Sequence, residues 1–129
     1  ARELFSLVHL DERAQARTSA QVSGGEAQRA SIVRALINDP ELVFADEPTG
    51  ALNSHNSQAV LDVFCTLHAN GQSIVMVTHD RHSALRANRV LYLRDGAIAG
   101  ECTLGAWDGD EPYGEREHTL AVFLNEMGW

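Results

Sequence analysis

The stretch "LVFADEP", residues 42–48, decides the fold of this chain. Four consecutive apolar residues are followed at once by two acids, Asp46 and Glu47, and then by Pro48. A short, continuously apolar run is typical of a strand that is buried on both faces, as in a parallel sheet. The stretch "SIVMVTHD", residues 73–80, repeats this pattern. We therefore expect two buried strands whose carboxyl ends carry polar side chains.

A helix is expected between these two strands. Asn53 or Ser54 can cap its start, and Asn70-Gly71 supplies a stop after Ala69. Its expected inner face is Ala59, Val60, Val63, Phe64 and Leu67. Two buried strands joined by a helix imply a parallel sheet covered on both faces, hence an α/β fold. In such sheets, ligands bind beyond the carboxyl ends of the strands, where Asp46, Glu47 and His79 stand.

The periodicity predicts further elements on both sides of this unit. A helix from Gly25 or Glu26 to Ile37 is expected to bury Ala27, Ala30, Val33 and Ile37, with Ile32 and Leu36 beside them. Residues 1–9 are expected to form a short helix, followed by a polar loop through residue 25. A short helix is expected at 81–87, and a hairpin with an Asp95-Gly96 turn in "RVLYLRDGAIAGE". The last helix, 115–127, should dock through Leu120, Phe123, Leu124 and Met127.

The composition of the 129 residues excludes several classes of protein. The net charge is −8, and residues 101–129, with seven acids and one arginine, carry −6 of it, which disfavours nucleic-acid binding through a basic face. No apolar run approaches the roughly 20 residues of a spanning helix, so membrane association is expected only through a partner. Cys65 and Cys102 belong to no C-x-x-C pair and are expected to be free thiols in a reducing cytoplasm.

Three short stretches could carry chemistry. Two acids at the end of an apolar strand favour a divalent cation and a water-activating carboxylate, or else a solvated acidic turn. His79 could bond a phosphate oxygen or a catalytic water, or else merely cap the next helix. Ser23, Gly24 and Gly25 precede a helix, which suits a phosphate seat but also an ordinary helix cap. The chain has no lysine, so a G-x-x-x-x-G-K-[ST] phosphate loop is impossible within it.

The order of these stretches resembles the second half of an ATP-binding-cassette (ABC) ATPase. "VSGGE", residues 22–26, is similar to the family's signature, commonly L-S-G-G-Q, and "LVFADE" to its Walker B strand. "TGALNS" stands where the D-loop lies, and "VTHD" is similar to the switch-histidine strand. The resemblance continues through the hairpin, over roughly the first hundred residues. "ADEPTGAL" looks most like the branch serving lipoprotein release, macrolide export and antimicrobial-peptide resistance.

The resemblance implies a fold and a set of roles. Residues 1–103 would form the C-terminal half of a nucleotide-binding domain, a partial P-loop NTPase (RecA-like) core with the signature helix and the hairpin. Residues 104–129 would form an acidic linker and a C-terminal helix. Glu47 would be the general base, His79 would contact the γ-phosphate, and Asp46 would hold Mg²⁺, through water. Ser23, Gly24, Gly25, Glu26 and Asn53 would face the ATP of a second, head-to-tail protomer or the dimer interface.

The family likeness also implies a setting. The intact domain would hydrolyse ATP at the cytoplasmic face of the cell membrane and drive a separate membrane permease, without nucleic acid as a partner. Two departures stand against the pattern: the aspartate usual at the end of the D-loop is Asn53, and no Walker A loop, adenine-stacking aromatic residue or Q-loop is present. The chain by itself is therefore expected to be inactive. The strand that normally pairs beside "LVFAD" would also be missing, so "LVFAD" is expected to have an exposed apolar edge.

Two other classes of function remain open at this point. One is a soluble ABC ATPase of DNA repair or translation, which co-purification with a permease would exclude. The other is a non-catalytic remnant or interaction module. The reading frame upstream of Ala1 distinguishes this last class, because an intact glycine-lysine loop there restores an enzyme.

Overall fold

The computed structural model describes residues 4, 6, 8, 10, 23–107, 109 and 114–129. The chain divides into two units, Ala1–His79 and Asp80–Trp129. Most of the helix expected at 1–9 and of the loop expected before residue 25 lies outside the described residues. Leu4 and Ser6 are helical, and the N–H of Val8 donates to the carbonyl of Leu4. The division expected at residue 103 stays a prediction.

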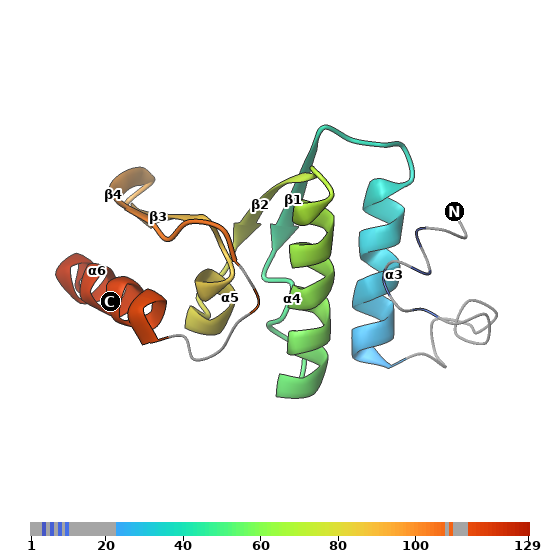
Figure 1. Ribbon diagram of the computed structural model, residues 1–129, viewed down its shortest axis with the longest axis horizontal. Coiled ribbons are helices and arrows are strands. Elements are labelled where there is room, and N and C mark those ends of the chain that lie inside the picture. Colours follow the sequence, from blue (N-terminus) through green and yellow to red (C-terminus); the bar gives the residue numbers. More distant parts are fainter. Residues whose placement is uncertain are drawn as a thin grey trace. The chain divides into compact units, whose positions relative to one another are not determined.

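The first unit contains the expected alternation of helices and strands. Its elements are α3 (Gly24–Leu36), β1 (Leu42–Asp46), α4 (Ser54–Ala69) and β2 (Ser73–Val77). The two strands pair in parallel, with Leu42 opposite Ser73 and Asp46 opposite Val77. Figure 1 shows α3 and α4 side by side, with α4 next to the strands. Both strands therefore end at the same edge of the sheet, as the α/β prediction requires.

Local sequence fixes where the two helices begin. Ser23 and Glu26 form a reciprocal capping box at the start of α3, and Asn53 caps α4 by accepting the N–H of Asn56 at 2.9 Å. At the other end of α4, Asn70 is followed by Gly71 with φ +95°, a left-handed turn that suits glycine. These caps lie at the positions that the sequence predicted.

One face of the sheet is packed and the other is exposed. Val43 and Ala45 join α3 and α4 in a buried core that also contains Val60, Val63, Phe64 and Leu67. The opposite face is exposed, with Phe44 at 73% and Val77 at 56%, beside Leu42 and Val75. Within the first unit, the expectation of a sheet covered on both faces is therefore wrong, because no described element of this unit forms a layer over the second face.

The buried stripe of α3 also differs from the expectation. Ala27, Ala30 and Ile37 are exposed, whereas Gly25, Ile32, Val33 and Leu36 are buried. Helix α3 packs against α4. Gly25, Ile32, Val33 and Leu36 share one face of α3, and this face is the buried one. The stripe is thus rotated by about one residue from the prediction, toward the side that α4 covers.

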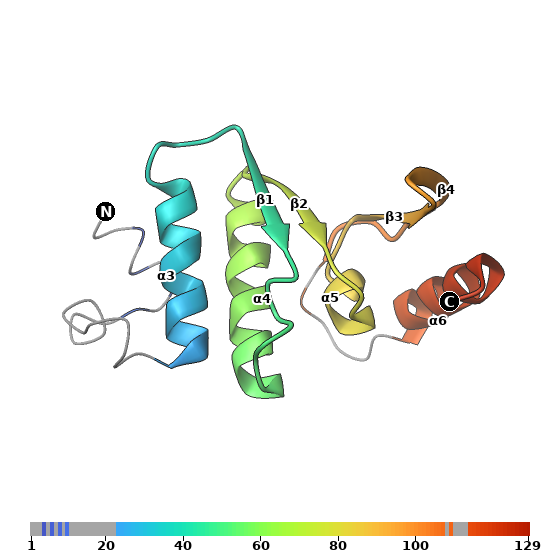
Figure 2. The same ribbon diagram turned by 180° about the vertical axis from the view of Figure 1, so that it is seen from behind.

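The second unit is a hairpin packed on a helix. It contains α5 (Arg81–Leu85), β3 (Arg89–Arg94), β4 (Ala97–Thr103) and α6 (Gly114–Met127). Asp95 and Gly96 both have positive φ, 52° and 77°, which matches a two-residue hairpin turn. Leu120, Phe123 and Leu124 of α6 are buried with Cys102 of β4. Figure 2 shows this unit from the reverse side, with α6 beside the hairpin.

Arg116 fixes the start of α6 to the rest of the second unit. Its guanidinium donates to five backbone carbonyls, those of Leu85, Ala87, Leu104, Gly105 and Ala106, and its Cζ lies 5.5 Å from the centroid of the Trp107 ring. A rigid fork with five N–H donors is suited to such a cluster of acceptors. The expected docking of the last helix is therefore confirmed, with a polar clamp added to its apolar face.

Both cysteines are free thiols, as expected. Burial raises the pKa of the Cys102 thiol, and the charge of Arg116 offsets part of that rise. Among the described residues, no helix is both long and apolar enough to cross a membrane.

Candidate functional site

The turn at the start of α3 provides hydrogen-bond donors at a helix N-terminus. The Ser23 hydroxyl accepts the N–H of Glu26 at 3.2 Å, and the Glu26 carboxylate accepts the N–H of Ser23 at 2.7 Å. Gly24 and Gly25 are the first two residues of α3, so the helix has no acceptor for their amides. Having accepted one bond, the Ser23 hydroxyl still has its own proton to donate. These donors and the helix dipole suit an anion.

Glu26 adds a feature that the sequence did not predict. Its carboxylate accepts the N–H of Ser23, so this amide is already bonded and a negative charge is already present at the helix N-terminus. An incoming phosphate therefore finds the Ser23 hydroxyl and the amides of Gly24 and Gly25, and shares the site with an acidic neighbour.

Glu47 leaves the end of β1 in an unusual backbone conformation. Its N–H donates to the Val77 carbonyl at 2.8 Å, which extends the strand pairing by one residue, and its φ is +44°. Its carbonyl accepts the N–H of Gly50 at 3.1 Å, which closes a turn. A non-glycine residue with positive φ stores strain that the surrounding structure must hold, and such residues cluster at functional sites.

The carboxylate of Glu47 is held by the two residues that follow β2. Its Oε1 accepts the backbone N–H of His79 at 2.9 Å and lies 2.7 Å from the Nδ1 of His79. Its Oε2 lies 3.4 Å from the hydroxyl of Thr78. The His79 side chain is 80% exposed and that of Glu47 35%. The two residues singled out at the strand ends are therefore in direct contact, at a solvent-accessible edge.

This arrangement leaves chemical capacity at both groups. A carboxylate has about four lone-pair positions, and three of these are directed to Thr78 and His79, so one remains for a water molecule. When Nδ1 of His79 carries a proton toward Glu47, Nε2 is the ring nitrogen that can act as an acceptor. Thr78 was not singled out from the sequence, although its position directly before His79 was the available signal.

Asp46 is the exposed last residue of β1, one position before Glu47. Among the described residues, no group of three or more His, Cys, Asp or Glu side chains could hold a metal ion. One carboxylate nevertheless fits Mg²⁺ in nucleotide sites, because this ion takes one or two protein carboxylates and completes its shell with phosphates and water. The donor at this position is therefore compatible with Mg²⁺ that arrives with a nucleotide.

Asn53 lies at the N-terminus of α4 as its cap, with its side-chain oxygen directed to the amide of Asn56. An asparagine oxygen caps a helix as well as an aspartate does. Asn53 thus supplies the same helix cap that an aspartate would supply at this position, without the charge. Leu52, the residue before Asn53, lies next to the turn at residues 23–25, here named the signature turn. A Cβ built at Gly24 would have Cδ2 of Leu52 as its nearest atom.

The carboxylate that follows His79 caps the next helix. Asp80 accepts the Ser83 hydroxyl at 2.7 Å, the Ser83 amide at 2.9 Å and the His82 amide at 3.3 Å. Burial alone raises the pKa of Asp80, but these hydrogen bonds and the nearby His82 outweigh it, so the pKa lies below the ordinary value of 3.8.

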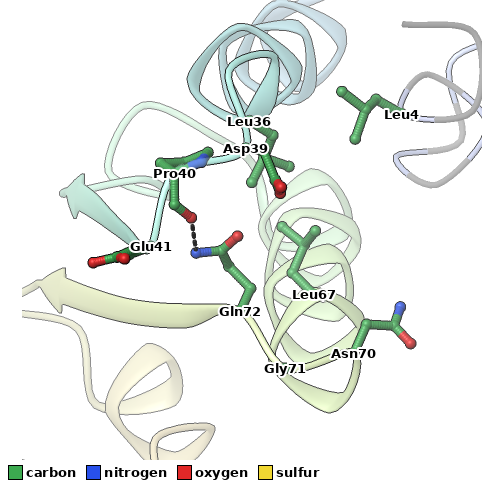
Figure 3. Close-up of a pocket in the computed structure, with 9 residues that line it drawn as sticks. All are labelled: Leu4, Leu36, Asp39, Pro40, Glu41, Leu67, Asn70, Gly71 and Gln72. Carbon is green, nitrogen blue, oxygen red and sulfur yellow. Dashed lines mark hydrogen bonds between the residues drawn. The ribbon is translucent and has the colours of Figure 1, made fainter.

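A hollow of about 280 Å³ lies at the opposite edge of the sheet. Figure 3 shows that it is lined by the connections that precede β1 and β2, where Gln72 donates to the carbonyl of Pro40 at 3.0 Å. Parallel strands place their amino ends far from their carboxyl ends, so this hollow is separate from Glu47 and His79.

Comparison with known proteins finds similarity to ABC transporter proteins. The family model described as ABC transporter matches residues 1–50. The chain is 45% identical over 101 residues to the macrolide export ATP-binding/permease protein MacB of Aggregatibacter actinomycetemcomitans, covering 78% of this chain and 16% of that protein. It is 52% identical over 83 residues to the lipoprotein-releasing system ATP-binding protein LolD of Aquifex aeolicus, covering 64% of this chain and 37% of the relative.

Solved structures agree with the sequence relatives. The dimeric ATP-binding cassette MJ0796, in a post-hydrolysis state bound to ADP and Pi, matches with a TM-score of 0.69 and 36% identity over 82% of this chain and 46% of that one. The ADP form of the cassette MJ1267 matches with a TM-score of 0.76 at 18% identity, which supports the fold alone. The chain thus spans less than half the length of each of these relatives. The α/β, P-loop NTPase fold expected from the sequence is confirmed, and so is the expected resemblance of this chain to part of an ABC transporter ATPase domain.

Proposed function

We propose that this chain is part of an ATP-binding and hydrolysing subunit that powers export, or peptide-resistance transport, through a separate membrane permease. The observation that carries the proposal is the contact between Glu47 and His79 at the carboxyl ends of two parallel strands. Asp46 directly precedes Glu47 at the same edge of the sheet. The names of two relatives, a macrolide export protein and a lipoprotein-releasing ATP-binding protein, support a transport role.

Glu47 is the proposed general base. Its carboxylate is held in place by His79 and Thr78 and keeps room for a water molecule, whose proton it takes as that water attacks the γ-phosphate of ATP. Nε2 of His79 is the proposed contact to that phosphate. Asp46 is the proposed ligand of Mg²⁺, through water, and the ion supplies neutralisation of phosphate charge when it is bound.

The signature turn is proposed to act in trans. Ser23, Gly24 and Gly25 offer a hydroxyl and two amides to the γ-phosphate of ATP bound by a second, head-to-tail protomer, with Glu26 and Asn53 in the same interface. The proposal agrees with the dimeric form of the matched cassette MJ0796.

The 129-residue chain by itself is proposed to lack ATPase activity. It contains no lysine, so it has no lysine loop to hold the β- and γ-phosphates. Calorimetry of the isolated chain with Mg-ATP should detect weak binding or none, and a sub-millimolar Kd would contradict this part of the proposal. In the cell, we propose a cytoplasmic location at the inner face of the membrane, reached through the permease, without nucleic acid as a partner.

A substitution of Glu47 tests the catalytic assignment in the complete natural protein that contains this sequence. Glu47→Gln keeps the size of the side chain and removes the base, so ATP binding should persist while turnover falls by about 10²–10⁴-fold. The matched control is Glu41→Gln, since Glu41 is exposed directly before the amino end of β1 and should leave turnover unchanged. Near-normal hydrolysis by Glu47→Gln would remove Glu47 from the role of base.

A further inference from the structure

The signature turn rests on the first turn of α4 at a single close contact. Gly25 is buried, and a Cβ built on it would lie 2.8 Å from both Cγ and Oδ1 of Asn56 and 3.0 Å from its Cβ. Real Cβ atoms essentially never approach other atoms more closely than 3.0 Å, so a residue with a Cβ at position 25 would require Asn56 to shift. The neighbouring Gly24 differs, because its nearest atom, Cδ2 of Leu52, would be at an ordinary contact distance of 3.4 Å.

Asn56 is itself firmly held. It is the third residue of α4, and its amide donates to the side chain of the cap Asn53 at 2.9 Å. The turn that precedes the cap is closed by the N–H of Leu52, which donates to the carbonyl of Thr49 at 3.0 Å. Four residues beyond Asn56, the same helix enters the buried core at Val60. The side chain that meets Gly25 therefore projects from a fixed part of the first unit.

We propose that Asn56 is a positioning residue for the signature turn. Its side chain sets how close the first turn of α3 lies to α4, and this fixes the direction of the amides of Gly24 and Gly25. The inference rests on the proposed function, in which these amides meet the partner's γ-phosphate. Donors aimed at a phosphate act best when they are held in place before it arrives, and errors of about 1 Å are costly. Asn56 thereby acts on catalysis without touching the nucleotide.

A double-mutant cycle tests the contact on the 129-residue chain, through the free energy of unfolding in urea. Gly25→Ala should destabilise the chain, because its new Cβ collides with Asn56. Asn56→Ala removes the Cγ and Oδ1 atoms with which this Cβ collides. The double variant should therefore be less destabilised than the two single destabilisations added together. We expect the difference to be about tenfold in the unfolding equilibrium constant. Gly24→Ala combined with Asn56→Ala is the matched control and should be additive. Additive effects for the Gly25 pair would overturn the inference.

The positioning role is tested in the complete natural protein. The parent is the Glu47→Gln variant, which should bind ATP but turn it over slowly. The measured quantity is the protein concentration needed for ATP-dependent dimerisation. Asn56→Ala should weaken the dimer by roughly threefold to tenfold, within the range of contact couplings, while the affinity of each protomer for ATP stays unchanged. If Asn56 had a purely structural role, Asn56→Ala would lower stability only. Dimerisation measured well below the unfolding temperature would then be the same as in the parent, and that result would overturn the proposal.

The same experiment separates this inference from the proposed function. If the parent itself forms no dimer with ATP, the proposed function fails, and the positioning role fails with it. If the parent dimerises and Asn56→Ala dimerises equally well, only the positioning role fails.

Discussion

The carboxylate of Glu47 is bound twice by His79, a residue that follows the neighbouring strand β2. Its Oε1 accepts the backbone N–H of His79 at 2.9 Å and contacts Nδ1 of the same residue at 2.7 Å. The backbone bond depends on the pairing of β1 with β2, whereas the ring contact depends on the χ angles of an exposed side chain. The backbone bond therefore holds the carboxylate of Glu47 independently of the rotamer of the His79 ring.

Thr78→Val tests the third contact of Glu47 in the complete natural protein. The hydroxyl of Thr78 lies 3.4 Å from Oε2 of Glu47, at the long end of the hydrogen-bond range, and valine keeps its shape without the donor. We expect kcat to fall by about twofold to fivefold with KM for ATP unchanged, because a long hydrogen bond contributes less than about 1 kcal/mol. Steady-state kinetics measures both constants, and a loss as large as that of Glu47→Gln would mean that Thr78 takes part in the chemistry.

Asp80→Asn should change how the stability of the chain depends on acid. The folded-state pKa of Asp80 lies below 3.8, so the charged form stabilises the fold fully above about pH 4, and this contribution is lost as the pH falls through the lowered pKa. The amides of His82 and Ser83 donate to different oxygens of Asp80, so asparagine keeps an acceptor for only one of them, and it cannot titrate. We expect the unfolding free energy of the variant to fall less steeply below pH 4.

Ser83→Ala is the companion variant for that measurement. It removes the hydroxyl that donates to Asp80 at 2.7 Å, so it should reduce the acid dependence without abolishing it. Urea unfolding of the three proteins between pH 2.5 and 7 gives the comparison. Parallel curves for the parent chain and Asp80→Asn would contradict the role assigned to this carboxylate.

Phe44→Glu should reduce self-association of the 129-residue chain. Phe44 is 73% exposed on the sheet face that it shares with Leu42, Val75 and Val77, and an exposed apolar face of this kind promotes association. We expect a smaller average mass in light scattering and weaker binding of a hydrophobic dye, with stability changed by about 0.5 kcal/mol or less.

Phe64→Ala is the contrasting substitution, since Phe64 is buried in the core of the same unit. It should cost about 3–5 kcal/mol of unfolding free energy. If the parent chain is monomeric and binds no dye, the exposed sheet face has no such effect in solution.

The order of elements could be predicted because each carries its own local signal. The apolar runs at 42–46 and 73–77, the cap at Asn53 and the Asp95-Gly96 turn are visible within a few residues of sequence, and all of them are found in the structure. The position of Glu47 and His79 at one edge of the sheet followed from a general rule, since parallel strands bring their carboxyl ends together, but their direct contact was not predicted.

Features that depend on distant packing could not be predicted. The continuous apolar character of β1 and β2 suggested burial on both faces, but the pattern cannot tell whether a second layer is present among the described residues. The buried stripe of α3 was misjudged because its orientation depends on α4. The contact between Gly25 and Asn56 joins residues that belong to different helices, and no local pattern indicates it.

The central claim is that the signature turn of one protomer completes the site that contains Glu47 of the other. Two inactive variants of the complete natural protein test it: Glu47→Gln, and Ser23→Arg, which blocks the signature turn. In a mixed dimer of these variants, a site built in trans pairs the intact Glu47 of one protomer with the intact Ser23 of the other. A site built in cis carries one defect in every protomer.

The deciding measurement is the ATPase rate of the two variants mixed in equal amounts, compared with each variant alone. The composite site predicts that mixing restores a clear part of the wild-type rate, because each mixed dimer contains one intact site. A mixture as inactive as its two components, with mixed dimers demonstrated by differential tags, would contradict the claim that Ser23 and Glu47 act across the dimer.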